Sequence, residues 1–155
     1  MNIVLYQPEI PHNTGAIGRT CLVTASTLHL IRPYGFFLDE KSLKRSGLDY
    51  WHKLDVREYD SFEMFAKNNP RGERFFFVET TGGRSYTDVK YEPNDYFIFG
   101  SETTGISQAI LDSYPEQIVR IPMKSGERSL NLSVAVGIVL FEGLRQVGFI
   151  PLSAQ

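Results

Sequence analysis

The feature that most restricts the fold of this chain is the alternation of short apolar runs with longer helical patterns. The apolar runs have the length of buried strands, and turn residues or polar clusters bound them. The runs predicted as strands are Ile3–Tyr6, Thr27–Ile31, Arg74–Glu79, Tyr96–Phe99 and Gln117–Ile121. Strands that alternate with helices are typical of a mostly parallel sheet with helices on both faces. The sequence therefore predicts an α/β fold.

Capping residues predict where the helices begin and end. After a rigid turn at Pro8 and Pro11, Asn13 is a candidate N-cap, and Asp60 is another. Gly148 stands where a glycine commonly follows a helix. The predicted helices are Thr14–Ala25, a short basic helix from Asp39 to Gly47, a helix from Asp60 through Ala66, Ser107–Asp112 and Asn131–Val147.

Length and composition restrict the domain organisation and the compartment. The chain has 155 residues, 42% hydrophobic and 22% charged, and we expect residues 1–155 to form a single domain. The single cysteine, Cys21, excludes an intrachain disulfide, and its apolar neighbours predict a buried thiol. No apolar run approaches the ~20 residues of a membrane span, and the opening segment does not resemble a signal peptide. We therefore expect a cytoplasmic protein with no membrane partner.

The last predicted helix is apolar on almost every side. Its apolar residues are Leu132, Val134, Ala135, Val136, Ile138, Val139, Leu140, Phe141 and Leu144. A helix that is apolar all round is buried all round, and a small domain has little interior to hold one. The pattern favours a second subunit that covers the helix; a central core helix in a monomer is the alternative.

Three polar interruptions follow predicted strands in the same manner. They span Asn13–Arg19, Gly100–Gly105 and the stretch Ile121–Ser133. Small polar residues at a helix start leave backbone N–H groups pointing at whatever lies in front of the helix. Three such interruptions in a small α/β chain predict one composite site, with a ligand held largely by main-chain atoms.

The first interruption contains a glycine and an arginine one helical turn apart. Gly15 and Arg19 share a helix face, so the glycine would leave room for a substrate beside the guanidinium. Arginine presents five fixed donors that suit a phosphate or a developing alkoxide. A capped helix with a surface arginine is the alternative interpretation of the same spacing.

The second interruption argues against the common nucleotide-binding folds. The Gly100–Gly105 loop lacks the lysine of a P-loop, and no Gly-x-Gly-x-x-Gly occurs in the chain. The second strand ends in Arg32-Pro33 rather than an acid that could hold ribose hydroxyls, which argues against an ordinary Rossmann domain. A plain strand-to-helix turn is the alternative for this loop. The three histidines show no ligand spacing, so we expect no metal site, and His29 is predicted to be structural.

A basic segment is the candidate contact for nucleic acid. The net charge of −2 gives no general attraction to RNA, so an RNA partner needs a local basic patch or one shared by two subunits. Lys41, Lys44 and Arg45 are interleaved with acids, which is typical of a solvated face. Tyr50 and Trp51 follow them, and exposed aromatic rings can stack on bases.

Taken together, the three motifs resemble those of the knotted SPOUT RNA methyltransferases. The motifs are Asn13-x-Gly15-x-x-x-Arg19, Phe99-Gly100-x-Glu102-x-x-Gly105, and Ile121-Pro122-Met123 with Ser129-Leu130-Asn131-Leu132-Ser133. The segments Ile3–Pro11 and Asp39–Trp51 resemble the small single-domain branch that 2′-O-methylates the tRNA wobble nucleotide, cytidine or uridine. The resemblance covers nearly the whole chain.

The resemblance implies a fold, a cofactor and roles for particular residues. It implies a deep C-terminal trefoil knot, a homodimer whose site is completed across the interface, and S-adenosylmethionine as methyl donor with S-adenosylhomocysteine as product. Arg19 would be catalytic, and Asn131 would act with it by shaping the pocket. The residues expected to bind the cofactor are Glu79, Gly100, Glu102, Ile121, Met123 and Ser129; those expected to bind tRNA are Asn13, Lys41, Lys44 and Arg45.

Two rival functions remain open at the level of sequence. One is 2′-O-methylation of another tRNA or rRNA ribose, and the other is a non-catalytic knotted dimer that binds RNA. The joint presence of Arg19, Glu102 and Asn131 disfavours the second. Ala16 and Val134 stand where close relatives often have asparagine, and Phe141 stands where they often have tyrosine.

Overall fold

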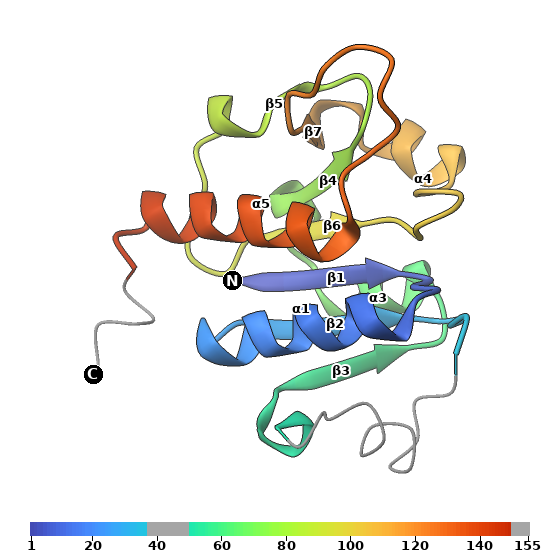
Figure 1. The fold of residues 1–155 in the computed structure, drawn as a ribbon, viewed down its shortest axis with the longest axis vertical. Helices are drawn as coiled ribbons and strands as arrows, with labels where there is room; N and C mark the ends of the chain where they lie inside the picture. Colours follow the sequence, from blue (N-terminus) through green and yellow to red (C-terminus); the bar gives the residue numbers. More distant parts are fainter. Residues whose placement is uncertain (37–49, 150–155) are drawn as a thin grey trace.

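The computed structural model describes residues 1–36 and 50–149, and within them the chain forms one parallel sheet (Figure 1). The seven strands of this part of the chain lie in the order β3-β2-β1-β6-β4-β7-β5, and every neighbouring pair is parallel. The strands are β1 Asn2–Tyr6, β2 Thr27–Ile31, β3 Val56–Tyr59, β4 Phe75–Glu79, β5 Arg84–Ser85, β6 Tyr96–Phe99 and β7 Ile118–Arg120. The predicted α/β class with a mostly parallel sheet is confirmed.

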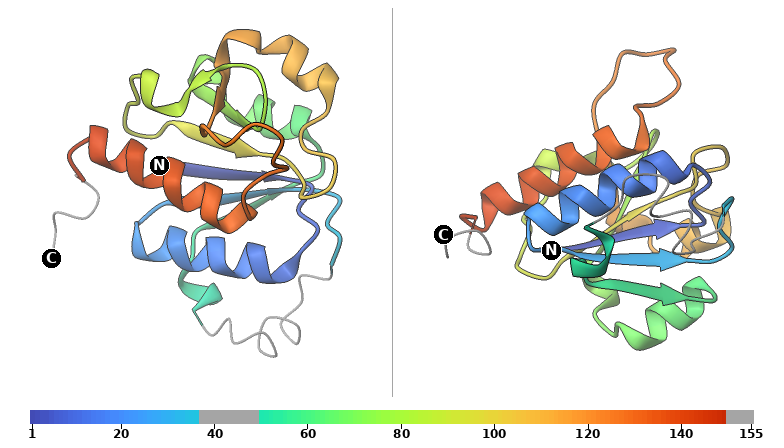
Figure 2. Two further views of the ribbon diagram at one scale, coloured as in Figure 1. Left: turned by 45° about the horizontal axis from the view of Figure 1, so that its top comes forward. Right: turned by 60° about the horizontal axis from the view of Figure 1, so that its bottom comes forward.

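Helices cover both faces of the sheet, as Figure 2 shows. The α-helices are α1 Pro11–Val23, α3 Phe62–Asn68, α4 Gln108–Ser113 and α5 Leu132–Gln146. Short 3-10 helices lie between them at η1 Trp51–Lys53, η2 Gly72–Arg74, η3 Tyr86–Asp88 and η4 Pro115–Gln117. α1 and α5 lie side by side on one face, while α3 and α4 pack on the other.

The core consists of two apolar clusters, one on each face of the sheet. Under α1 and α5, side chains such as Ile17, Cys21 and Val139 pack on the strands. Cys21 is buried as predicted, and burial raises the pKa of its thiol to about 12. α5 approaches β6 closely, because a Cβ at Gly143 would lie 2.7 Å from the Phe97 ring. The opposite cluster is rich in phenylalanine from α3 and β4.

The structure corrects several predicted helix and strand boundaries. α1 begins at Pro11 rather than Thr14, so Asn13 lies in the first turn of the helix and Ile10 is the N-cap residue. Ser61, not Asp60, caps α3, because its hydroxyl accepts a hydrogen bond from the backbone N–H of Met64. The sequence analysis missed β3 and β5, whose charged and polar residues gave no apolar run. The expected basic helix from Asp39 lies outside the described residues.

α5 is buried on one side only. Val136, Val139, Leu140 and Leu144 face the core, whereas Val134 and Phe141 are 49% and 47% exposed. The alternative of a central core helix within one chain is therefore wrong, because an apolar strip remains on the outer side of α5; the covering second subunit stays a prediction. Asn131 is the N-cap of α5, and Gly148 follows the helix with φ +70°, as expected from the sequence. No helix within residues 1–36 and 50–149 is long and apolar enough to cross a membrane.

Candidate functional site

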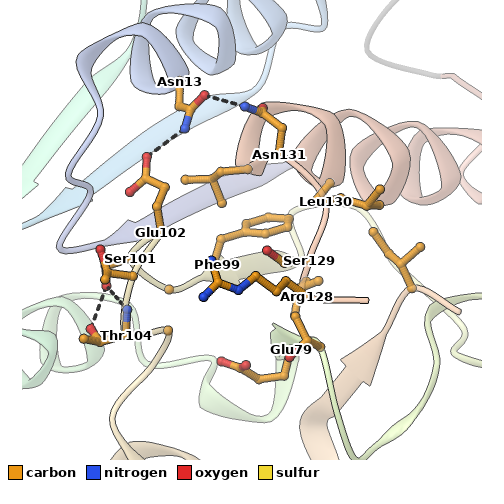
Figure 3. Close-up of a pocket in the computed structure, with 18 of the residues that line it drawn as sticks. Asn13, Glu79, Phe99, Ser101, Glu102, Thr104, Arg128, Ser129, Leu130 and Asn131 are labelled. Atoms are coloured by element: carbon orange, nitrogen blue, oxygen red, sulfur yellow. Dashed lines mark hydrogen bonds between the residues drawn. The ribbon is translucent and has the colours of Figure 1, made fainter. Parts of the chain in front are cut away.

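The three polar interruptions meet at a single pocket of about 740 Å³ (Figure 3). The pocket lies beyond the carboxyl ends of β4, β6 and β7, because strands that run parallel bring these ends to the same edge. Its lining comprises Ile10, Asn13, Val78, Glu79, Thr80, Phe99, the loop residues 100–105, Ile121, Met123, residues 128–132 and Ala135. The three interruptions thus contribute to one pocket as predicted, and the binding of a ligand there stays a proposal.

All the residues expected to bind the cofactor line this pocket. These are Glu79, Gly100, Glu102, Ile121, Met123 and Ser129, and Asn13 and Asn131 join them. Glu79 comes from the end of β4, Gly100 and Glu102 from the loop after β6, and Ile121, Met123 and Ser129 from the segment between β7 and α5. The sequence therefore identified the elements that build the pocket, and their roles toward a ligand remain a proposal.

A chain of hydrogen bonds joins the three motifs at one wall of the pocket. The Asn131 amide Nδ2 donates to Asn13 Oδ1 at 3.0 Å, and Asn13 Nδ2 donates to Glu102 Oε1 at 2.9 Å. Asn131 Oδ1 accepts from the backbone N–H and the hydroxyl of Ser133 in the first turn of α5. Both amide atoms of Asn13 thus bind within the protein. We infer that Asn13 serves first as the link between α1, the β6 loop and α5.

Glu102 holds the start of α1 at this wall of the pocket. Its carboxylate oxygens accept hydrogen bonds from the backbone N–H groups of Glu9 at 2.9 Å and Ile10 at 3.2 Å. The Glu9 carboxylate in turn accepts from the backbone N–H of Thr103 at 2.9 Å and from its hydroxyl. A negative charge beside the first N–H groups of a helix is favourable. The segment before α1 and the loop after β6 therefore stabilise each other.

The loop after β6 needs glycine at both of its ends. Gly105 has φ +69°, a left-handed conformation that side chains disfavour. A Cβ at Gly100 would lie 2.2 Å from the carbonyl carbon of Gly105, so any larger residue there would collide with the backbone. Ser101 and Thr104 join their hydroxyls at 2.8 Å within the turn. The loop is therefore a tight turn, as the alternative interpretation holds, but it also forms one wall of the pocket.

Glu79 places a partly desolvated carboxylate in the pocket. Burial raises its pKa, and hydrogen bonds from the backbone N–H groups of Ile106 and Thr80 offset part of that rise. The bond from the Ile106 N–H to Glu79 Oε1 is 3.3 Å long. The carboxylate also lies near Gly105, because a Cβ added to this glycine would be 3.6 Å from Glu79 Oε1. This carboxylate is suited to accept hydrogen bonds from a polar ligand.

The segment before α5 exposes unpaired main-chain groups to the pocket. Ser129 and Leu130 make no hydrogen bond within residues 1–36 and 50–149. Both residues are exposed, and both line the pocket. Unpaired N–H and C=O groups at the start of a helix are available for a bound ligand. This arrangement is the one that the sequence predicted for the third interruption.

Arg19 lies apart from the pocket. It is an exposed side chain of α1 and does not line the cavity, and its guanidinium carbon lies 4.6 Å from the centroid of the Tyr50 ring. Gly15, one turn earlier, is buried, and its carbonyl accepts a hydrogen bond from the Tyr50 hydroxyl. The interpretation that Gly15 leaves room for a substrate beside Arg19 is therefore wrong, because Tyr50 fills that space.

Comparison with known proteins identifies the family. Residues 1–141 match the model of the SpoU rRNA methylase family. The chain belongs to this family. It is 51% identical to a Listeria monocytogenes serotype 4b (strain F2365) protein over 96% of this chain and 89% of that one. It is 46% identical to the tRNA (cytidine(34)-2′-O)-methyltransferase of Burkholderia pseudomallei (strain 1106a) over 96% of each chain.

Solved structures agree with this SpoU family assignment. A structure described as giving insights into 2-OH methylation of C/U34 on tRNA superposes with a TM-score of 0.87 and 44% identity, covering 95% of both chains. The SpoU methyltransferase AviRb from Streptomyces viridochromogenes, solved in complex with the cofactor AdoMet, has a TM-score of 0.77 at 23% identity, covering 95% of this chain and 60% of that one. The second likeness concerns the fold alone.

The sequence analysis of this SpoU family member missed Arg128 as a pocket residue. Arg128 lines the cavity, and Figure 3 shows its side chain extending across it. Its position directly before Ser129 was the available signal, because a neighbour of a predicted binding residue shares its loop. Lys41, Lys44 and Arg45, predicted to bind RNA, lie outside the described residues. Within the described residues, no cluster of three or more His, Cys, Asp or Glu side chains could hold a metal ion.

Proposed function

We propose that this SpoU family member transfers a methyl group from S-adenosylmethionine to the ribose 2′-hydroxyl of the tRNA wobble nucleotide, leaving S-adenosylhomocysteine. The observation that carries the proposal is the hydrogen-bonded chain Asn131–Asn13–Glu102, which joins all three motifs at one pocket. The names of the similar proteins support the substrate. A tRNA substrate is consistent with a protein of the cytoplasm.

The pocket residues suit S-adenosylmethionine in size and chemistry. A cavity of about 740 Å³ lies within the range of small-molecule and cofactor sites. Val78, Ile121, Leu132 and Ala135 offer apolar surface for a purine, and the unpaired main-chain groups of Ser129 and Leu130 offer hydrogen bonds. Glu79 and Arg128 add charges of both signs, which matches a ligand with an ammonium, a sulfonium and a carboxylate.

The chemistry divides between the pocket and Arg19. When bound, S-adenosylmethionine supplies an electrophilic methyl group for in-line attack by the ribose hydroxyl. The guanidinium of Arg19 stays charged at neutral pH, so it does not act as the base. Its role is to orient the hydroxyl and the neighbouring phosphate and to stabilise developing negative charge. Asn13 and Asn131 hold the pocket wall in the geometry that the reaction needs.

A homodimer is part of the proposal. Arg19 faces outward from its own chain, and Val134 and Phe141 expose apolar surface on α5, which packs beside α1. Pairing two copies would cover this surface and bring Arg19 of one protomer toward the pocket of its partner. An acidic chain also gains a larger RNA-binding surface when two copies combine their basic segments. The C-terminal knot remains a prediction.

Nucleoside mass spectrometry tests the proposed reaction. The protein is incubated with S-adenosylmethionine and tRNA, and nuclease fragments are then analysed for 2′-O-methylated nucleosides. We expect methylation in the anticodon-loop fragment, and none when the wobble nucleotide carries a 2′-deoxyribose. Methylation of a different fragment would show that the enzyme acts on another ribose. Tight tRNA binding without methylation of any fragment would indicate a non-catalytic RNA-binding dimer.

A further inference from the structure

We propose that Tyr50 is a positioning residue for Arg19, and that it sets the orientation of the guanidinium in methyl transfer. The inference rests on the proposed function of Arg19, and the geometry that carries it belongs to this chain. Tyr50 lies 31 residues after Arg19, yet the two side chains meet on the surface of α1. No sequence motif joins them.

The Tyr50 side chain is held by a hydrogen bond and by burial. Its hydroxyl donates a 2.5 Å hydrogen bond to the carbonyl of Gly15, and the residue is only 9% exposed. One helical turn separates Gly15 from Arg19, so the ring spans the distance between the hydrogen bond and the guanidinium. A ring held in this way gives the Arg19 side chain a fixed surface to rest on.

The support is a cation–π contact, and it leaves the hydrogen-bond donors of the guanidinium available. The Arg19 guanidinium carbon lies over the ring at 4.6 Å from the centroid. Within the described residues Arg19 makes no hydrogen bond or ion pair, so its N–H groups are not used by this part of the chain. A cation–π contact is made with the ring as a whole, and it does not pair these N–H groups with a hydrogen-bond acceptor. Tyr50 therefore restricts the rotation of Arg19 while keeping its donors available for RNA.

The residues after Tyr50 hold it against α1. η1 begins at Trp51, and the Leu54 N–H donates to the carbonyl of Trp51 at 3.1 Å. A Cβ at Gly18 would lie 2.8 Å from the Trp51 ring, so this glycine admits the indole against α1. Leu54 also contacts the helix at this point, 3.1 Å from the Gly18 Cβ position. Gly18, directly before Arg19, thus serves the docking of the segment that carries Tyr50.

A double-mutant cycle tests the coupling between Tyr50 and Arg19. Single-turnover transfer of a tritiated methyl group to tRNA is measured for wild type, Tyr50→Leu, Arg19→Lys and the double variant. We expect Tyr50→Leu to slow transfer about 10-fold, the scale of a misplaced catalytic group, with little change in tRNA or cofactor affinity. In the Arg19→Lys background the same change should slow transfer less than about twofold, because an ammonium does not stack as a guanidinium does. Equal slowing in both backgrounds, or no slowing in either, would overturn the inference.

Control variants separate positioning from stability and from the proposed function. Tyr50→Phe keeps the ring and loses the hydroxyl, so its rate should fall between those of wild type and Tyr50→Leu. Phe62→Leu weakens the core on the opposite face and should leave the rate of folded protein unchanged. NMR of the Arg19 side chain provides a readout without activity, because the ring-current shift from Tyr50 should vanish in Tyr50→Leu. An inactive wild type that keeps this shift would contradict the proposed reaction, whereas an active wild type without the shift would contradict the role of Tyr50.

Discussion

At the scale of single residues, the groups that build the pocket are separate from Arg19, which we propose acts on the ribose. Asn13, Glu102 and Asn131 bind one another across three segments of the chain. Arg19 belongs to none of these contacts and lies on the outer surface of α1. Substitutions in the two sets should therefore have different consequences, one for stability and the other for turnover.

Arg19→Ala should abolish most turnover and spare the pocket. We expect methyl transfer to fall at least ~100-fold, the scale of losing a charge-stabilising donor. Cofactor affinity, measured by calorimetry, should barely change, since Arg19 does not line the cavity. Arg57→Ala, on the exposed edge strand β3, removes a comparable charge and should keep wild-type turnover. Retained turnover in Arg19→Ala would remove the residue from the mechanism, and lost cofactor binding would relocate its role to the pocket.

Glu102→Gln should destabilise the fold. The carboxylate accepts hydrogen bonds from the N–H groups of Glu9 and Ile10 and from the Asn13 amide, and the NH₂ group of glutamine cannot accept. We expect the free energy of unfolding, measured with urea, to fall by about 1–3 kcal/mol. Glu116→Gln, an exposed change of equal charge in η4, is the control and should change stability little. Equal stabilities of the two variants would show that Glu102 does not hold the start of α1.

At the scale of elements, a buried polar network joins β1, β2 and β3. His29 of β2 is fully buried, with Nε2 3.1 Å from Asn2 Oδ1 and Nδ1 3.0 Å from the Tyr59 hydroxyl. Asn2 Nδ2 donates to the Asn94 carbonyl, so Asn2 Oδ1 is the acceptor for the His29 Nε2–H. Nδ1 then accepts from the Tyr59 hydroxyl. The network fits a neutral histidine, in agreement with its predicted structural role.

The His29 network predicts a pH dependence of stability. Burial, and secondarily the charge of Arg57, lowers the pKa of His29 from 6.5 to about 4. Between these values the unfolded chain binds a proton that the folded chain does not, so stability falls as the pH drops through that window. The loss attributable to His29 is about 3 kcal/mol when the window has been crossed.

Urea unfolding of His29→Gln from pH 7 to pH 4 measures this contribution. The variant should be less stable at pH 7 and should lose less stability on acidification than wild type. His12→Gln, at an exposed position of α1, should keep the wild-type pH profile. An unchanged profile in His29→Gln would show that His29 does not titrate as its environment indicates.

At the scale of the whole molecule, the outer side of α5 is the surface on which the proposed dimer is tested. Val136 is unsuitable for that purpose, since it is fully buried within one chain and a charge there would unfold it. Phe141 is 47% exposed, so Phe141→Glu should leave the single chain folded.

Phe141→Glu should shift the protein from dimer to monomer. Sedimentation velocity measures the assembly state, and we expect methyl transfer to be lost with the dimer. Met64→Glu makes the same kind of change at a side chain of α3 that is also 47% exposed, on the opposite face, and should remain dimeric. A monomeric wild type with full activity would contradict the dimer requirement.

The sequence by itself determined the fold class and the elements of the pocket. Apolar runs such as Ile3–Tyr6 and Tyr96–Phe99 encode strands through local burial, and their alternation with helices predicts a parallel sheet. The polar residues after those strands had to meet at one edge, because parallel strands place their carboxyl ends together. Local periodicity and chain direction were sufficient for these conclusions.

Only the tertiary structure decided how the ends and surfaces of these elements are used. α1 begins at Pro11 because Glu102, 92 residues after Ile10, accepts the N–H groups at its start. Arg19 rests on Tyr50 because the segment after residue 49 docks beside Gly18. Such partners are chosen by packing between distant segments, whose side chains leave no periodic pattern at either position. The boundaries, the support of Arg19 and the exposed side of α5 therefore became visible only in the folded chain.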